Sequence, residues 1–205
     1  MSETKYKEDL KEIREIMERS SRFISLSGWS GIAAGITALL GLYLAYQAVY
    51  EGQDYLGYRK AYLTKAMILE VIFISVATVG MALGLGILFT TRKSKKQNQK
   101  IWSPQVKRLL IEFFIPMITG GVVCLIFLFK GFIGVLAPLT LIFYGLALLN
   151  ASKYTISEVR SLGIAEICLG LCSLYFIGYG LIFWALGFGV LHIVYGALMQ
   201  VKYKG

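Results

Sequence analysis

The sequence predicts an all-α fold: a polytopic membrane bundle of six transmembrane helices, preceded by a short cytoplasmic amphipathic helix. Hydrophobic residues make up 57% of the 205-residue chain and charged residues only 16%, whereas soluble domains carry about 25% charged residues. The charges are also confined to short segments between long apolar runs. These observations divide the chain into residues 1–22, the amphipathic helix, and residues 23–205, the transmembrane domain.

Six apolar runs approach the length of about 20 residues that a helix needs to cross a bilayer. They are residues 23–47, 65–90, 109–129, 132–150, 161–180 and 181–200. Most lysines and arginines fall on one side of this arrangement, and the other side carries only Arg59, Lys60, Lys65 and Lys130. Because cytoplasmic loops are enriched in basic residues, we expect both termini in the cytoplasm.

The amphipathic helix is predicted over residues 4–22, where Tyr6, Leu10, Ile13 and Met17 recur at helical spacing on one face. Acidic and basic residues balance in this tail, whereas helices that bind anionic lipid are usually basic. We therefore expect the apolar face to pack on the membrane domain or on a cytoplasmic protein partner. The alternative is a solvated extension that only helps to set topology.

The loop between the second and third runs is strongly basic and is expected to contact anionic headgroups at the cytoplasmic face, or an acidic partner. Simple determination of topology is the alternative reading. Its basic residues are Arg92, Lys93, Lys95, Lys96, Lys100, Lys107 and Arg108.

Glu166 and His192, the only histidine, lie inside apolar runs, and ionisable residues in membrane segments are costly and often functional. With a turn near Gly180 the two residues fall at similar depth, so Glu166 can pair with His192 or with Tyr195. Such a pair is either a proton- or ligand-responsive element or a structural contact between helices. Each polar residue has glycines at −3 and +4, which share a helix face and permit close packing: Gly163, Gly170, Gly189 and Gly196.

Two further acids have simpler explanations. Glu70 lies near the outer end of the second run, where its carboxylate can reach water. Glu112, the second candidate acid for an intramembrane role, lies one turn after Arg108, and an ion pair at this spacing would account for it.

A weak internal repeat suggests three parallel two-helix hairpins of about 50 residues, as some transporter families have. Two returning helices end alike, in YGLALLNASKY from Tyr144 and YGALMQVKYK from Tyr195, and the glycine-rich start of the first run resembles the fifth. Chance similarity between apolar sequences is the alternative. GxxxG spacings occur at Gly31–Gly35 and Gly80–Gly84, where we expect internal packing, with a homo-oligomer contact as the alternative.

Signatures of enzymes and cofactor sites are absent from the sequence: there is no nucleophile elbow, P-loop, dinucleotide fingerprint or HExxH. Three cysteines, Cys124, Cys168 and Cys172, lie in apolar runs without a metal-binding motif. The net charge of +9 follows from loops that set topology. We therefore expect no catalytic residues, no cofactor, no metal and no direct binding of nucleic acid.

The start of the chain, YKEDLKEIREIMERSSRFISLSGWSGIAAGITALLG, resembles a family of uncharacterised six-span membrane proteins of Bacteroidota over about residues 6–42. The resemblance implies a bacterial inner (cytoplasmic) membrane location and a regulatory role, because such proteins are often encoded beside a winged-helix regulator. The expected function is a non-enzymatic membrane regulator or scaffold with a cytoplasmic partner. The alternative is a small oligomeric transporter or channel that uses Glu166 and His192.

Overall fold

The computed structural model describes residues 27–50, 64–96 and 102–202, and within these ranges the chain is helical and has no β-strand. The amphipathic tail and Lys100 lie outside the described residues. The main helices are α2 (Gly28–Tyr50), α3 (Lys65–Lys96), α4 (Pro104–Phe129), α5 (Leu136–Ala151), α6 (Glu158–Tyr175), α7 (Gly180–Trp184) and α8 (His192–Lys202). Short 3₁₀ segments, η1 (Ile133–Val135) and η2 (Ser152–Tyr154), flank α5, and a π-helix, η3 (Ala185–Leu191), joins α7 to α8.

Five helical segments of the described chain are long and apolar enough to cross a membrane. They are Gly28–Val49, Lys65–Lys96, Pro104–Phe129, Ile133–Tyr154 and Gly180–Lys202, and they correspond to five of the six expected runs. The remaining run corresponds to α6, which is 18 residues long and carries Glu158, Arg160 and Glu166. Its charge content is what sets it apart from the other five.

The described residues of the basic segment after the second run are mainly helical. Helix α3 continues to Lys96 and places Lys93, Lys95 and Lys96 in its last turn, where positive charge interacts favourably with the helix dipole. Helix α4 then begins at Pro104, and the Ser103 side chain caps it by accepting a hydrogen bond from Val106 N at 3.3 Å. The expected loop is therefore helical at both ends, since Arg92 belongs to α3 and Lys107 and Arg108 belong to α4. Lysine and arginine are good helix formers, so charge alone did not mark the end of α3.

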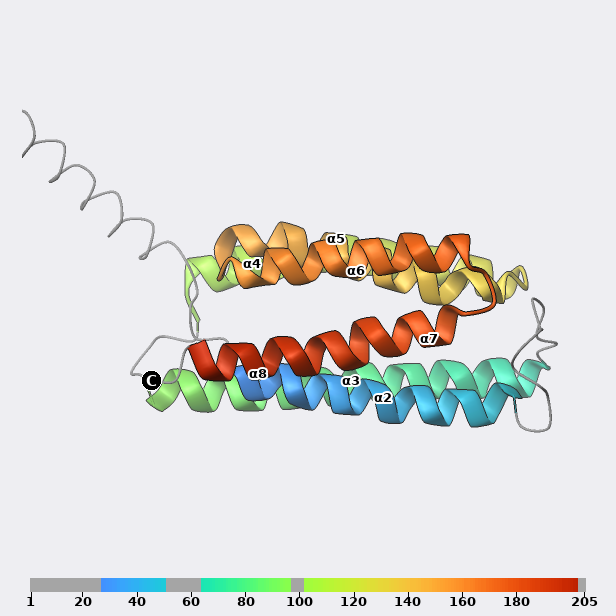
Figure 1. The fold of residues 1–205 in the computed structure, drawn as a ribbon, viewed down its shortest axis with the longest axis horizontal. Helices are drawn as coiled ribbons and strands as arrows, with labels where there is room; N and C mark the ends of the chain where they lie inside the picture. Colours follow the sequence, from blue (N-terminus) through green and yellow to red (C-terminus); the bar gives the residue numbers. More distant parts are fainter. Residues whose placement is uncertain (1–26, 51–63, 97–101, 203–205) are drawn as a thin grey trace, which may run out of the picture.

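The helices form two layers (Figure 1). In one layer α5 packs between α4 and α6, and in the other α2 packs between α3 and the continuous helical segment α7–η3–α8. The chain passes from one layer to the other between α6 and α7, where Gly178 has a positive φ of 111°, a conformation that favours glycine. This turn lies just before Gly180, close to its expected position.

Close glycine contacts hold each layer together. A Cβ atom added at Gly145 of α5 would lie 2.6 Å from the carbonyl oxygen of Gly163 in α6. In the other layer, a Cβ atom added at Gly196 of α8 would lie 2.5 Å from the carbonyl oxygen of Gly28 in α2. The two helix pairs therefore approach backbone to backbone, which only glycine permits at these positions.

These two contacts follow one residue pattern. Helix α6 uses Gly163, Ile167 and Gly170 against α5, and α2 uses Gly28, Ile32 and Gly35 against α8, with the same spacing. On the other side of each contact, Ile142 and Gly145 of α5 have the same spacing as Ile193 and Gly196 of α8. The glycine-rich start of the first run and the fifth run, which resemble each other in sequence, thus have the same packing role.

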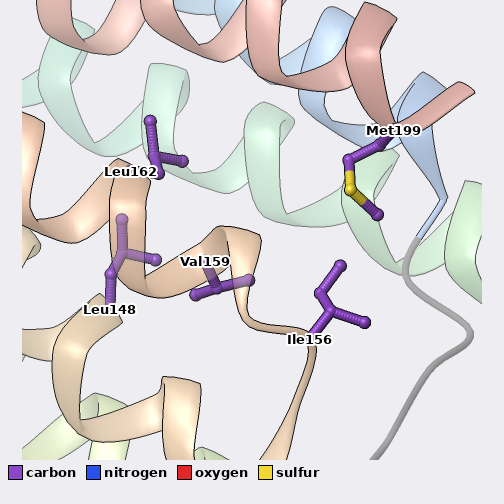
Figure 2. Close-up of a cluster of buried hydrophobic side chains, with 5 residues drawn as sticks. All are labelled: Leu148, Ile156, Val159, Leu162 and Met199. Carbon is purple, nitrogen blue, oxygen red and sulfur yellow. The ribbon is translucent and has the colours of Figure 1, made fainter. Parts of the chain in front are cut away.

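A cluster of apolar side chains joins the two layers near the beginning of α6 and the end of α8 (Figure 2). Met199 comes from α8, whereas the other members come from α5, from α6 and from the segment before α6. They are Leu148, Ile156, Val159 and Leu162. Their burial ties the layers together by the hydrophobic effect at this end of the bundle.

We expect Gly163→Leu to destabilise the protein by about 1–3 kcal/mol or more, because overpacking at a close contact forces the backbones apart. A Cβ at this position would lie 2.8 Å from the Gly145 carbonyl oxygen and 3.1 Å from Leu149 N. Gly86→Leu is the matched control, since a Cβ at Gly86 meets no atom within 4 Å. Unfolding by titration with SDS in mixed micelles measures both variants. Equal losses would contradict the packing role of Gly163.

Candidate functional site

A polar centre formed by Glu166, His192 and Tyr144 lies at the boundary between the two layers. Glu166 is on α6, Tyr144 is on α5, and His192 is the first residue of α8, directly after the π-helix η3. The exposed fraction is 0% for Glu166 and 6% for His192. The centre is therefore a buried contact that links α8 of one layer to α5 and α6 of the other.

Both ring nitrogens of His192 have hydrogen-bond partners. Nδ1 lies 3.0 Å from the carbonyl oxygen of Gly187, and Nε2 lies 2.7 Å from the hydroxyl of Tyr144. Because a carbonyl oxygen can only accept, Nδ1 carries a proton and donates it to Gly187. In the neutral imidazole, Nε2 then accepts the Tyr144 hydroxyl proton, so this network defines one tautomer.

The π-helix contributes directly to this network. Gly187 precedes His192 by five residues, and in a π-helix the backbone pattern also spans five residues. The Gly187 carbonyl therefore accepts from a side chain at the point where the helix returns to ordinary α geometry. Short π segments inside helices are frequent at functional sites.

Glu166 is the incompletely satisfied member of the centre. Its Oε1 lies 3.4 Å from His192 Nδ1, beyond the usual range of an N–H···O hydrogen bond. Within the described residues, neither carboxyl oxygen has a hydrogen-bond donor. A buried charge without such partners is costly, so the proton content of this carboxyl strongly affects how α6 and α8 interact.

Gly187 also makes space for the carboxyl group. A Cβ atom at this position would lie 2.5 Å from Oε2 of Glu166 and 2.5 Å from Cδ2 of Leu141. Sequence reasoning missed Gly187 and Tyr144. In the sequence, Tyr144 stands out only as the start of the repeated YGLALLN segment. Gly187 lies five residues before His192 and so falls outside the −3 and +4 spacing of the flanking glycines.

The four flanking glycines do not bring the two polar residues together, contrary to the expectation of matching glycine faces. Gly163 and Gly170 contact α5, whereas Gly189 and Gly196 contact α2. The reason is geometric: residues at −3 and +4 lie about 50° around the helix from the polar residue. Each glycine face packs inside its own layer, and Glu166 and His192 are directed to the boundary.

The remaining candidates lie away from the polar centre. Glu112 is half-buried on α4, and the expected ion pair with Arg108 is absent from the described residues, where Arg108 is exposed. Glu70 is exposed near the beginning of α3. Neither acid contacts Glu166 or His192, so they do not extend the site.

An apolar groove of about 240 Å³ runs between α6 and α8, next to the polar centre. Leu162, one turn before Glu166, and Leu191, adjacent to His192, line its inner part. An ion pair between Glu158 and Lys202 lies at the opposite part of its lining. The groove therefore extends from the polar centre toward the end of the bundle where α8 terminates.

Within the described residues, no group of three or more His, Cys, Asp or Glu side chains could hold a metal ion. Comparison with protein-family models, with curated proteins and with solved structures gives no match to this chain.

We expect Tyr144→Phe to lower stability by about 1–3 kcal/mol, because it leaves the buried Nε2 of His192 without its donor. Tyr175→Phe is the matched control, since the Tyr175 side chain is 83% exposed. SDS titration of both variants in mixed micelles measures the difference. An unchanged unfolding midpoint for Tyr144→Phe would show that the hydrogen bond does not contribute.

Proposed function

We propose that the chain is a non-enzymatic, multi-pass protein of the bacterial inner membrane that regulates a cytoplasmic partner. In this proposal α6 is the sixth span and both termini are cytoplasmic, as the distribution of basic residues favours. The observation that carries the proposal is the buried polar centre, which joins the two layers through one incompletely satisfied carboxyl group.

The polar centre suits a switch because its interaction depends on protonation. A carboxylate beside a protonated imidazole attracts it, whereas the same carboxylate beside a neutral ring is a buried charge with little compensation. Histidine changes charge near neutral pH. Gain or loss of one proton, or binding of a ligand to the carboxyl group, therefore changes the preferred spacing of α6 and α8.

A displacement of α8 relative to α6 would be transmitted toward the N-terminal tail through α2. Helix α8 packs against the beginning of α2 through the backbone contact of Gly196 with Gly28. Residues 1–22 precede α2 in the chain, so a displacement of α8 moves the base of the tail. In the proposal, the tail presents its apolar face to the partner in one state of the centre and not in the other.

Deletion of residues 1–20 tests the regulatory function. We expect the truncated protein to remain in the membrane fraction and to lose crosslinking to its cytoplasmic partner in intact cells. We expect Glu166→Gln, in the full chain, to change the amount of the same crosslinked species at least about threefold, since it removes the ionisable proton. The proposal fails if both variants capture the partner as the wild type does.

A second candidate function is transport, and one observation favours it. The Glu166 carboxyl, which has no hydrogen-bond donor among the described residues, lies between the two layers, and transporters commonly bind substrate between halves that rock against each other. Against it, Glu166 and His192 are buried, whereas transport requires the site to become open to water.

Flux measurements separate the two functions. Proteoliposomes with the purified full chain are loaded in turn with a dye that responds to protons, to sodium or to potassium, and the matching ion gradient is applied. The regulatory proposal expects no flux above empty liposomes for any of these ions. A flux that Glu166→Gln abolishes would overturn it in favour of transport.

A further inference from the structure

The chain forms three hairpins, α2–α3, α4–α5 and α6–α8, and each layer contains a contact between the second helix of one hairpin and the first helix of another. Helix α5 packs on α6 through Gly145 and Gly163, and α8 packs on α2 through Gly196 and Gly28. With three hairpins, the third contact of this series would place α3 on α4. The described residues of α3 and α4 do not form a comparable contact.

The face of α3 that this third contact would use can be identified from α5. In α5, Phe143 contacts Gly120 of its own hairpin, and two residues later Gly145 contacts the next hairpin. In α3, Thr78 contacts Gly41 of its own hairpin, and two residues later comes Gly80. Gly80, with Gly84 one turn further, therefore occupies on α3 the face that Gly145 occupies on α5.

This face of α3 is open. A Cβ atom added at Gly80 or at Gly84 would meet no atom within 4 Å. The finding differs from the sequence expectation that the Gly80–Gly84 spacing serves internal packing, whereas Gly31 and Gly35 do contact α8. A lipid-facing surface has no need of such glycines, but a close helix contact does.

The matching face of α4 is open as well and carries large side chains. Gly120 of α4 and Gly41 of α2 have the same role inside their hairpins, which aligns the two helices. The α2 face toward α8, which includes Ile32, Gly35 and Leu39, then corresponds on α4 to Ile111, Phe114 and Ile118. The exposed fractions of these three are 51%, 41% and 64%.

We propose that a second copy of this chain completes the third contact: the Gly80–Gly84 face of α3 packs against the Ile111–Phe114–Ile118 face of α4 in the partner. The open position continues a series of two contacts already present in the chain, and small residues on one side meet large ones on the other. A two-fold axis parallel to the helices forms the contact twice, because each copy supplies both faces.

The same chain is less suited to supply both faces of one contact. The contacts of Thr78 with Gly41 and of Phe143 with Gly120 hold α3 and α4 in different layers. Bringing these helices together would require the layers to rotate about the α6–α8 boundary and would disturb the Glu166–His192 pair. Two copies complete the contact without any such movement.

The first test compares Gly84→Leu with Gly86→Leu in the full chain. A Cβ atom at either position meets no atom within 4 Å in the single chain, so we expect neither variant to disturb the packing of its own chain, but Gly86 lies on a different face of α3. Energy transfer between donor- and acceptor-labelled copies in liposomes measures dimerisation. We expect Gly84→Leu to weaken it about tenfold or more, with Gly86→Leu like the wild type. A monomeric wild type, or equal effects of the two variants, would overturn the proposal.

The second test locates the contact. In a background with Cys124, Cys168 and Cys172 replaced by Ala, one tagged copy carries Ala77→Cys and a differently tagged copy carries Phe114→Cys, because Ala77 corresponds to Ile193 of α8 and Phe114 to its contact Gly35 of α2. Oxidation in liposomes should give the mixed disulfide dimer, and a copy with Gly86→Cys in place of Ala77→Cys should not. If both cysteines are placed on one chain and only an internal crosslink forms, the third contact is intramolecular and the proposal is wrong.

Discussion

The arrangement of the whole molecule depends on backbone-to-backbone contact between helices at glycine. Because a Cβ at Gly145 or Gly196 would lie within 2.6 Å of a carbonyl oxygen of the neighbouring helix, these contacts fix both the distance and the rotation of the helices they join. Apolar side chains alone do not specify such rotation inside a membrane, since lipid tails are as apolar as leucine. Once α6 is fixed on α5 and α8 on α2, the directions of Glu166 and His192 are determined.

The polar centre then follows from this rotation rather than from mutual attraction of its members. Each helix presents its glycines to its own layer, and the polar residue, about 50° away around the helix, is presented to the other layer. His192 is fully hydrogen-bonded by Gly187 and Tyr144, whereas Glu166 has the 3.4 Å contact with Nδ1. His192 is thus held rigidly, whereas Glu166 is incompletely satisfied. This combination is expected of a responsive element, because a change in protonation or ligand binding acts at the single Glu166 carboxyl group.

Sequence alone predicted the helical class, the five helices of membrane length and the proximity of Glu166 to His192, since these depend on run length and on depth from a turn. It did not predict the two layers, because helix order in a bundle depends on contacts between segments far apart in sequence. Tyr144 was missed for the same reason: it is 48 residues from His192. The spacing of the glycines places them near the polar residue on the helix surface, but it does not show which neighbouring helix they contact. That depends on how each helix is rotated in the bundle.

The open faces of α3 and α4 and the polar centre both bear on how far the two layers can move relative to each other. The layers contact each other through the cluster around Met199 and through the polar centre, both of which involve α8 and the layer containing α6. In the proposed dimer, α3 of each copy packs on α4 of the other, so the two layers of one copy would also be linked through the partner at their other edge. Relative movement of the layers in one copy would then require movement in the other, so two polar centres would respond together. Dimerisation would in this way couple the two polar centres, which is the physical advantage that a two-fold assembly would give to the regulator proposed above.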